Sequence, residues 1–596
     1  MAVIIEGDNI LSALGETTAE NISNIKSGIS GIKRVEGFIP SQSEAFMLSR
    51  IDCGETSGRT LEERMIFSVS KAISSISEGE ISSSDTIFVF STTKGDLKSP
   101  LWKSAEIVTE HFNNPNRPVV ISNACISGVV AIIVAKRLMD CGLYKRAIVV
   151  GADEVSRFIV AGFGCLKALS SKRCRPFDIE RDGLNLGEAI GTLVLKLSDN
   201  PECENVTGFV EPQVVLAGAI TNDANHISGP SRTAEGLFRA IGRIHKMTGR
   251  LPENKGFINP HGTATIYNDQ MESIGIARAG LDKMRVNPLK SYYGHTLGAA
   301  GVIETILSAH FADEGFLPQP LGYEVPGTDP ILNIHRDPER FEADWFLKLV
   351  SGFGGTNAAI EVVKASVLKS GEASSLIVAE ADSLRTAMNG GLFINKNVSV
   401  CNTGDSKEFL NGLYRSLEIR YPKFHKMDLL CKGGIIAMHQ LIGSPEDDLR
   451  NIESDGLCGK RFSKAELENT ALVFLNSSSS KAADDEFFKG ISDENFYPSP
   501  SVFVYTLPSV VIGEVSIRYK FYGEGTFFIA DKLCGDRLLP YIKRLFTEGA
   551  TSRLILCWDE VTEDKCQIAA ALITASATPK AEPLTEESLD GLCRFN

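Results

Sequence analysis

The chain has 596 residues, of which 43% are hydrophobic and 23% charged, and its formal net charge is −14 at pH 7. This composition is typical of globular proteins, and the length predicts more than one domain. The acidic balance argues against nucleic acid as a general partner, and no apolar run reaches the ~18 residues that a membrane span requires. The 13 cysteines form no Cys-x-x-Cys pair and the chain begins without signal-peptide features, so we expect a reducing, cytoplasmic location and no zinc ribbon.

The first third of the chain alternates apolar β-rich runs with helical patterns. Such continuous apolar strands predict an α/β layered fold around a mostly buried sheet. The predicted strands are Val3–Ile5, Asp85–Gly95, Val119–Ile121 and Lys145–Asp153, and the predicted helices lie near Thr18–Ser27, Leu61–Ile76 and up to Met139.

One of these units places a cysteine at the junction of a strand and a helix. The run from Val119 to Ile121 passes through small polar residues to Cys125, and an apolar helix follows. Unpaired backbone N–H groups and the positive end of a helix dipole favour a thiolate, so this position predicts a cysteine pKa below about 8.5. The alternative interpretation is a small buried core cysteine.

The alternation restarts near Val214 and ends in a glycine-rich turn. The segment Ala365–Ser375 is small and polar, and we interpret it as a linker. Within this second region the predicted strands are Val214–Ala219, Gly256–Asn259, Leu349–Asn357 and Ala358–Val363, and the predicted helices are Thr233–Gly249, Met271–Ala279 and Gly298–Phe311.

Residues 376–596 resemble the first region weakly in the spacing of their apolar runs. Thr470 lies 39 positions before Ser509, as Thr86 lies before Cys125, and Ser552–Val561 is similar to the strand after Cys125. We therefore expect an internal repeat in which Ser509 takes the place of the nucleophile, although two buried strands can share a spacing by chance. The final residues, 579–596, are predicted to be a mobile tail.

Two histidines have unusual surroundings. His261 follows a predicted strand in a run of Gly and Thr, and His295 precedes a helix in a run of Gly and Ala. Small residues let other groups approach closely. A lone histidine is more often a core or surface residue, but one cysteine with two imidazoles suits acyl transfer to a thiolate followed by carbon–carbon chemistry at a carbonyl.

Several separated motifs occur in a fixed order along residues 1–365. They are Asn123–Gly128, Arg175–Gly183 with Gly187-Glu188, His261–Thr265 with Asp269, Lys290–His295, and Gly352–Asn357. Together they make the chain resemble the β-ketoacyl-acyl carrier protein synthases, the elongating condensing enzymes of the thiolase superfamily. The resemblance implies a thiolase-like layered αβαβα fold with duplicated halves, residues 1–213 carrying the nucleophile and residues 214–365 carrying both histidines.

The resemblance also implies a catalytic role for four of these residues. Cys125 attacks the thioester of an acyl carrier protein and holds the acyl chain. His261 and His295 polarise the malonyl thioester carbonyl as CO2 leaves, and Lys290 fixes the charge near His261. The expected activity is a decarboxylative Claisen condensation with malonyl carrier protein, in fatty acid or polyketide and polyene biosynthesis.

Other positions match supporting roles in the same family. The backbone N–H groups of Cys125 and Phe353 form the oxyanion hole, Phe353 gates the acyl pocket, and Thr263 and Thr265 contact the pantetheine arm. The remaining supporting residues are Asp269 and Glu304. For residues 175–182 we favour a buried ion-pair and turn network. No metal and no bound cofactor are implied, because phosphopantetheine arrives on the carrier protein.

Two departures from the family pattern affect the expectations. The stretch before Cys125 is shorter than usual, which changes the cap over the pocket and the dimer surface. Residues 376–596 form an additional half-thiolase-like α/β domain without a nucleophile, similar to chain-length-factor subunits, and we expect it to shape the pocket or a dimer. A homodimer, or a heterodimer with a synthase-like subunit, is implied. The alternative functions are a non-catalytic partner that binds carrier protein or a sister synthase, and decarboxylation without condensation.

Overall fold

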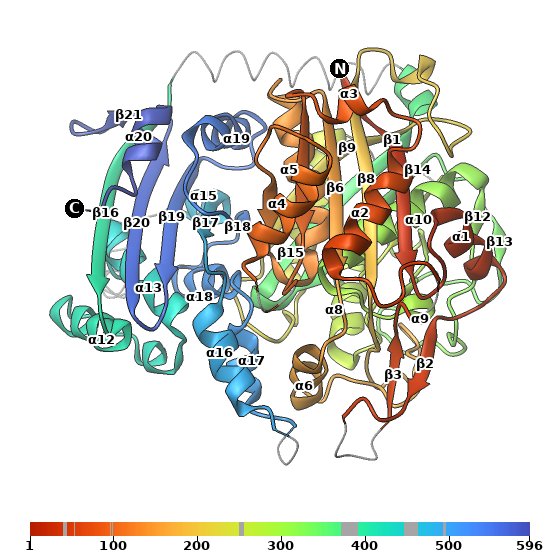
Figure 1. Cartoon of the computed structure of the whole chain (residues 1–596), viewed down its shortest axis with the longest axis horizontal. Coiled ribbons are helices and arrows are strands. Elements are labelled where there is room, and N and C mark those ends of the chain that lie inside the picture. The colour runs from red at the N-terminus through yellow and green to blue at the C-terminus, as the bar shows by residue number, and fades with distance from the viewer. Residues whose placement is uncertain are drawn as a thin grey trace.

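The computed structural model describes all residues except 40–44, 53, 96, 98, 250–254, 371–390, 446–462, 493–495 and 596. Most of its strands belong to one 16-stranded sheet that runs through the whole molecule (Figure 1). Among the described residues, no helix is long and apolar enough to cross a membrane. The sheet is built from three units with the same internal strand order.

The first unit has the strand order β1-β8-β6-β4-β5. β4 pairs parallel with β5 and β6, whereas β8 pairs antiparallel with β1 and β6. Its elements are β1 (Ala2–Ser12), α1 (Thr18–Lys26), α2 (Leu61–Ala72), β4 (Thr86–Ser91), α4 (Leu101–His111), β5 (Val119–Ile121), α5 (Ser127–Asp140), β6 (Arg146–Asp153), α6 (Arg157–Cys165) and β8 (Ala189–Ser198).

The second unit repeats this order as β9-β15-β14-β10-β11 and joins the first where Ile4 pairs with Val214. The buried helices α5 and α10 pack against each other. The predicted αβαβα layering with duplicated halves is thereby confirmed. The elements of this unit are β9 (Gln213–Asn222), α7 (Glu235–Thr248), β10 (Gly256–Asn259), α8 (Ile266–Arg278), β11 (Arg285–Val286), α9 (Lys290–Tyr293), α10 (Ala300–Glu314), β14 (Trp345–Gly352) and β15 (Thr356–Lys364).

The third unit has the order β18-β17-β19-β20-β16. This is the order of the first unit counted from β5 to β1, so β18 corresponds to β5 and β16 to β1. α13 packs on β16, β19 and β20 as α2 packs on β1, β6 and β8. Its elements are β16 (Phe393–Thr403), α12 (Ser406–Ser416), α13 (Leu429–Ile442), α15 (Lys464–Asn469), β17 (Thr470–Asn476), α16 (Lys481–Gly490), α17 (Pro500–Tyr505), α18 (Val510–Tyr519), β18 (Gly525–Ile529), α19 (Gly535–Thr547), β19 (Arg553–Val561) and β20 (Lys565–Thr574).

Smaller elements complete the chain. They are β2 (Ile32–Val35), β3 (Phe46–Ser49), α3 (Glu78–Ile81), β7 (Leu186–Gly187), β12 (Phe316–Leu317), β13 (Glu339–Arg340), β21 (Glu582–Pro583) and α20 (Glu586–Gly591).

The third unit meets the first through β18 and β5. Phe528 pairs with Ile121 and Ile529 with Val120 in an antiparallel arrangement, so the sheet continues without a break across the junction (Figure 1). The free edge that β5 would otherwise offer to another chain is therefore occupied by the same polypeptide.

The prediction that Ser509 stands in the nucleophile's place is wrong. The run around it forms α17 and α18, and the strand equivalent to β5 is β18. Leu533, two residues before α19, takes the position that Cys125 takes two residues before α5. The shared spacing of 39 was a coincidence, because a short apolar run fits a buried helix as well as a buried strand.

The predicted mobile tail is also wrong for the described residues up to 595. α20 packs against α19, and Leu589 is fully buried there. Leu592, three residues later, and Leu584, directly before the N-cap Thr585, are also buried, and these spaced leucines are the signal that the sequence interpretation overlooked.

A buried ion cluster ties α5 to the third unit. Arg137 donates to both carboxylate oxygens of Glu524, at 2.6 and 2.9 Å, and also pairs with Glu548. Replacing Arg137 by Met removes the cation that pairs with the buried Glu524 and leaves the buried Glu548 with Arg544 alone. We expect the free energy of unfolding to fall by about 3–5 kcal/mol, measured by urea denaturation. The change Lys145→Met removes an exposed ion pair instead and should cost less than about 1 kcal/mol; equal losses would contradict this assignment.

Candidate functional site

Cys125 lies in a single 3-10 turn, Ala124–Ile126, between β5 and α5. Ala124 before it adopts φ +50°, a left-handed conformation that non-glycine residues seldom take. The turn is anchored from the third unit, because the Asn123 side chain donates to the Gly525 carbonyl at 2.8 Å and accepts from the Phe527 N–H at 2.7 Å. β18 therefore helps to hold the cysteine in position.

The fold brings Cys125 together with both predicted histidines. The sulfur and one ring nitrogen each of His261 and His295 lie within 4.8 Å of one another, and all three residues are buried. The two imidazole rings are 5.0 Å apart between centroids and cross at 85°. One sulfur thus faces two imidazoles from a different half of the fold.

The expected low pKa of Cys125 is wrong. Burial raises the pKa of the Cys125 thiol to about 12, with the buried Asp153 carboxyl adding to the rise and the Lys290 ammonium opposing it. The helix terminus is too weak to offset complete removal of the sulfur from water. The resting sulfur is therefore a thiol, and its attack on a carbonyl requires a base.

Both imidazoles are suited to receive that proton. Burial holds the pKa of His261 well below its ordinary value, and the nearby Lys290 ammonium lowers it further. The same two causes lower the pKa of His295. Both rings are therefore neutral at physiological pH, and each has one nitrogen that can accept and one that can donate.

Lys290 belongs to a buried ion cluster beside His261. Its ammonium lies 3.4 Å from His261 Nδ1 and donates to the His261 carbonyl at 2.5 Å and to Glu304 at 2.7 Å. The other Glu304 oxygen accepts from Lys348 at 2.5 Å. Burial lowers the pKa of Lys348 to about 8 and the two ammoniums lower the pKa of Glu304. Sequence reasoning missed Lys348; its signal is a lone lysine within the buried strand β14.

Two carboxylates of α8 hold the loop that carries His261. Glu272 accepts from the N–H groups of His261 and Gly262, both at 2.6 Å. Asp269 accepts from the Ala264 N–H at 3.2 Å. It also accepts from the Phe177 N–H, which belongs to a second loop. Burial raises the pKa of Glu272 to about 7, with Asp269 adding to the rise, and burial raises the pKa of Asp269 to about 6. The sequence interpretation named Asp269 and missed Glu272.

The three residues line a pocket of about 440 Å³. Thr263 and Thr265 line it with their hydroxyls 2.9 Å apart, and Phe353 lines it from the glycine-rich turn after β14. A Cβ on Gly352 would lie 3.4 Å from the Cys125 nitrogen, so this turn lies directly against the nucleophile's amide.

Aromatic rings from all three units pack together at the wall of the pocket. The Phe163 ring lies 6.1 Å from Phe353 and 5.6 Å from Phe503 of α17. Gly162 packs against the same Phe503 ring. Figure 1 shows α16 and α17 beside α6, which carries Phe163. The third unit thus forms the layer behind the pocket wall.

The segment 175–182 forms an ion-pair and turn network as expected, but only part of it is buried: Asp178 is buried and the Glu180 side chain is 70% exposed. Arg175 pairs with Asp178 at 3.0 Å and with Glu180 at 2.6 Å. Asp178 also accepts from the N–H groups of Glu324 and Val325, which fixes the two loops together.

Comparison with known families agrees with this geometry. The family models described as the N-terminal and C-terminal domains of β-ketoacyl synthases match residues 104–200 and 213–324. The chain belongs to the β-ketoacyl synthase family. These two matches contain Cys125, His261, Lys290 and His295.

Relatives extend the comparison across the first two units. A 3-oxoacyl-[acyl-carrier-protein] synthase 2 of Vibrio cholerae is 28% identical over 60% of this chain and 98% of its own length. A protein of the same name from Synechocystis is 33% identical over 42% of this chain and 62% of its own.

Solved structures show the same fold at lower identity. The ketosynthase ApeO of Xenorhabdus doucetiae, solved with its chain length factor ApeC, superposes with TM-score 0.54 and 24% identity over 61% of this chain and 98% of that chain. The PfaC keto synthase–chain length factor superposes with TM-score 0.70 and 12% identity over 96% of this chain and 78% of that chain. The second match includes the third unit of the present β-ketoacyl synthase.

Proposed function

We propose that this β-ketoacyl synthase transfers an acyl group from an acyl carrier protein to Cys125 and extends it with a malonyl unit. The observation that carries the proposal is a buried thiol facing two neutral imidazoles in the lining of a pocket. No metal or bound cofactor is part of the proposal, because the phosphopantetheine arm comes on the carrier protein.

In the first half-reaction the Cys125 sulfur attacks the thioester carbonyl and its proton passes to an imidazole. The tetrahedral intermediate places its oxyanion near the N–H groups of Cys125 and Phe353, where fixed dipoles stabilise the charge. The carbon–sulfur bond to the arm then breaks, and the arm leaves with the proton as a free thiol. Thr263 and Thr265 contact the arm along the pocket.

In the second half-reaction His261 and His295 donate hydrogen bonds to the malonyl thioester carbonyl. CO2 leaves, and the electron pair of the broken bond becomes an enolate held by the two imidazoles. The enolate carbon attacks the acyl carbonyl on Cys125, the carbon–sulfur bond to Cys125 breaks, and the thiolate that leaves takes up a proton from water. Burial, with the Lys290 ammonium adding to it, lowers the pKa of both imidazoles and keeps them neutral, so each ring donates from one nitrogen and can accept at the other.

The third unit is proposed to be non-catalytic. Leu533 takes the nucleophile's place, and both histidines of the described part of this unit, His425 and His439, lie outside that turn. Its contributions are the anchor on Asn123 and the layer behind Phe163. The synthase-like partner expected for this family is then supplied within the same chain, and a second copy would have to bind elsewhere than β5.

A smaller side chain behind the pocket wall should change the products. In Phe503→Leu the Phe163 ring gains room to move away from the pocket, so we expect longer acyl products at a stability cost of about 1–2 kcal/mol. Mass spectrometry of products made with malonyl carrier protein measures this. Phe488→Leu, in which an exposed ring is changed, is the control; an unchanged product distribution in Phe503→Leu would contradict the role of this layer.

Incubation with an acyl carrier thioester tests the function directly. A condensing enzyme gains the mass of one acyl group on the peptide that contains Cys125, and then releases a chain extended by two carbons when malonyl carrier protein is added. A non-catalytic partner gains no acyl group, and an enzyme that only decarboxylates releases CO2 without an extended product.

A further inference from the structure

A buried ion pair joins the third unit to the first unit behind the pocket wall. The Lys94 ammonium donates to Asp484 of α16 at 2.5 Å, to the Ser480 hydroxyl at 3.2 Å and to the Thr506 carbonyl directly after α17. The Lys94 and Asp484 side chains are only 5% and 18% exposed. Groups of the third unit therefore accept from all three N–H donors of a buried ammonium of the first unit.

The first-unit side of this ion pair is held firmly. The Asp153 side chain, at the end of β6, accepts from the backbone N–H groups of Thr93 at 2.9 Å and of Lys94 at 3.3 Å. Asp153 also accepts from the Gly298 N–H at 2.7 Å, in the turn before α10. Because the loop that carries the ammonium is fixed in this way, a change at the ion pair acts on α16 and α17.

A series of aromatic contacts leads from the pocket to the ion pair. Phe163 lines the pocket, and its ring lies 5.6 Å from Phe503 of α17. The Phe503 ring lies 6.4 Å from Phe158, and the Lys94 ammonium lies 5.5 Å from the centroid of the Phe158 ring. Phe487 of α16 packs on both Phe158 and Phe503, at 4.9 and 5.2 Å. An acyl chain that pushed these rings aside would next meet the ion pair.

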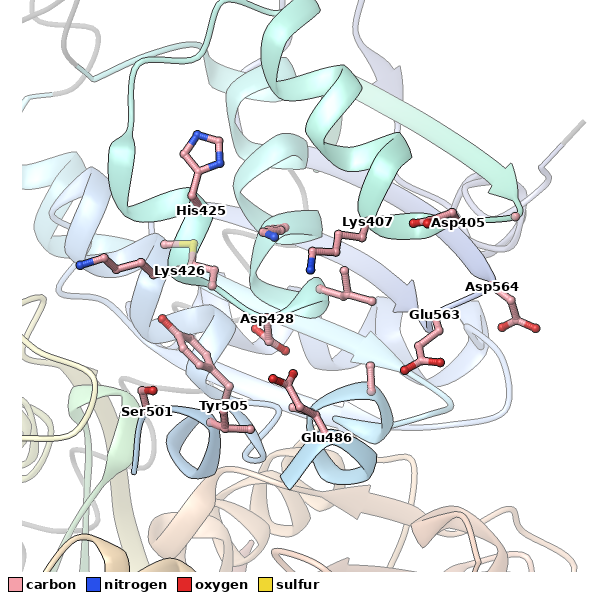
Figure 2. A pocket seen from close by; sticks show the side chains of 17 residues that line it. Asp405, Lys407, His425, Lys426, Asp428, Glu486, Ser501, Tyr505, Glu563 and Asp564 are labelled. Atoms are coloured by element: carbon pink, nitrogen blue, oxygen red, sulfur yellow. The ribbon is translucent and has the colours of Figure 1, made fainter. Parts of the chain in front are cut away.

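The opposite side of the same two helices faces open space. A cleft of about 720 Å³ lies there, and Glu486 of α16 and Tyr505 of α17 line it (Figure 2). None of the residues that line this cleft lines the pocket of Cys125. The helices α16 and α17 therefore form a layer between the pocket wall and the cleft.

The cleft lies beside a short connection whose counterpart in the first unit is long. β19 ends at Val561 and β20 begins at Lys565, so three residues replace the 35 that separate β6 from β8. Lys432, the fourth residue of α13, lines the cleft, whereas Arg64, the fourth residue of α2, pairs with Glu154 of the long connection at 2.7 Å. This leaves α16 and α17 with room on the side away from the pocket.

The ion pair opposes a shift of the layer into that room. An apolar chain offers nothing that replaces the hydrogen bonds of a buried ammonium. A shift of α16 into the cleft would also draw Asp484 away from Lys94 and leave a buried charge without its partner.

We propose that the Lys94–Asp484 ion pair sets the maximum length of the acyl chain on Cys125, by holding α16 and α17 against the ring of Phe163. The inference rests on the proposed function, in which an acyl chain attached to Cys125 lies in this pocket. Lys94 and Asp484 are specificity-determining residues in this view and take no part in the chemistry.

A series of N-alkyl chloroacetamides with tails of increasing length tests the proposal on the full chain. These probes alkylate a reactive thiol, so peptide mass spectrometry identifies the longest tail that modifies Cys125 without any need for condensation. In the double variant Lys94→Met with Asp484→Leu we expect a limit about two to four carbons longer than in the wild type, because the layer then yields at the cost of packing alone.

Lys94→Met alone should shift the limit in the same direction. The double variant keeps the test valid if the single variant does not fold, because apolar side chains often replace a whole buried ion pair without loss of stability. The products made with malonyl carrier protein should lengthen in parallel with the probe limit.

Lys481→Met is the matched control. Lys481 pairs with Asp485 on the same helix, but their side chains are 61% and 46% exposed, so we expect the wild-type limit. The same limit in the wild type and in the folded double variant would overturn the inference. A wild type that the probes modify but that makes no extended product would contradict the proposed function instead, and the probe limits of the variants would still decide the role of the ion pair.

Discussion

Cys125→Ala should gain no acyl group from an acyl carrier thioester and should lose condensation by at least about 10³-fold. The buried thiol is the group that faces both imidazoles, and alanine offers no nucleophile while fitting the same space. Intact-mass spectrometry measures the adduct, and product analysis with malonyl carrier protein measures condensation. Release of CO2 from malonyl carrier protein should persist, because His261 and His295 remain in place.

Cys165→Ala is the matched control for this experiment. Cys165 is a half-buried cysteine of the same unit, at the end of α6, and its Sγ donates to the Gly162 carbonyl and not to a catalytic residue. We expect full acylation of this variant. Acylation of Cys125→Ala at the wild-type level would show that the nucleophile is elsewhere and would end the proposed mechanism.

Glu304→Gln should cost about 3–5 kcal/mol of stability and reduce condensation strongly. Glu304 is 1% exposed and is the shared carboxylate of Lys290 and Lys348. The glutamine leaves two buried ammoniums without their negative charge, and its amide nitrogen would face one of them. Urea denaturation and condensation assays measure the two losses.

The double variant Glu304→Gln with Lys348→Met tests whether the loss of stability in Glu304→Gln comes from the missing negative charge or from the changed side chain itself. Removing the Lys348 ammonium leaves the glutamine oxygen free to accept from Lys290 alone, so stability should recover by at least half of the loss. Lys290 then keeps its contact with His261, and part of the activity should return. A double variant that is less stable than Glu304→Gln would contradict the assignment of Lys348 as a charge partner.

The fold of the first two units could be read from the sequence because its signals are local. Continuous apolar runs such as Lys145–Asp153 indicate buried strands wherever they lie, and β6 was found within one residue of that prediction. The third unit was harder, since the run around Ser509 is apolar enough for either a buried helix or a buried strand. Only the pairing of β18 with β5 decided which segment is the true counterpart.

The sequence by itself determined which residues carry the chemistry. Cys125, His261, Lys290 and His295 stand in short contiguous motifs, and a motif requires no knowledge of its neighbours. It could not determine their protonation. The pKa of Cys125 depends on how completely several layers of the fold remove the sulfur from water, which outweighs the local helix terminus.

Only the tertiary structure decided the pairings between distant residues. Lys348 donates to Glu304 only because β14 lies beside that residue in the folded chain. Asn123 likewise finds its partner in the Gly525 carbonyl only because β18 lies beside it. Lys432 is in the same position as Arg64, but a connection between two distant strands is short in one unit and long in the other. Charge balance inside a protein is set by which segments pack together, and that is a property of the folded chain.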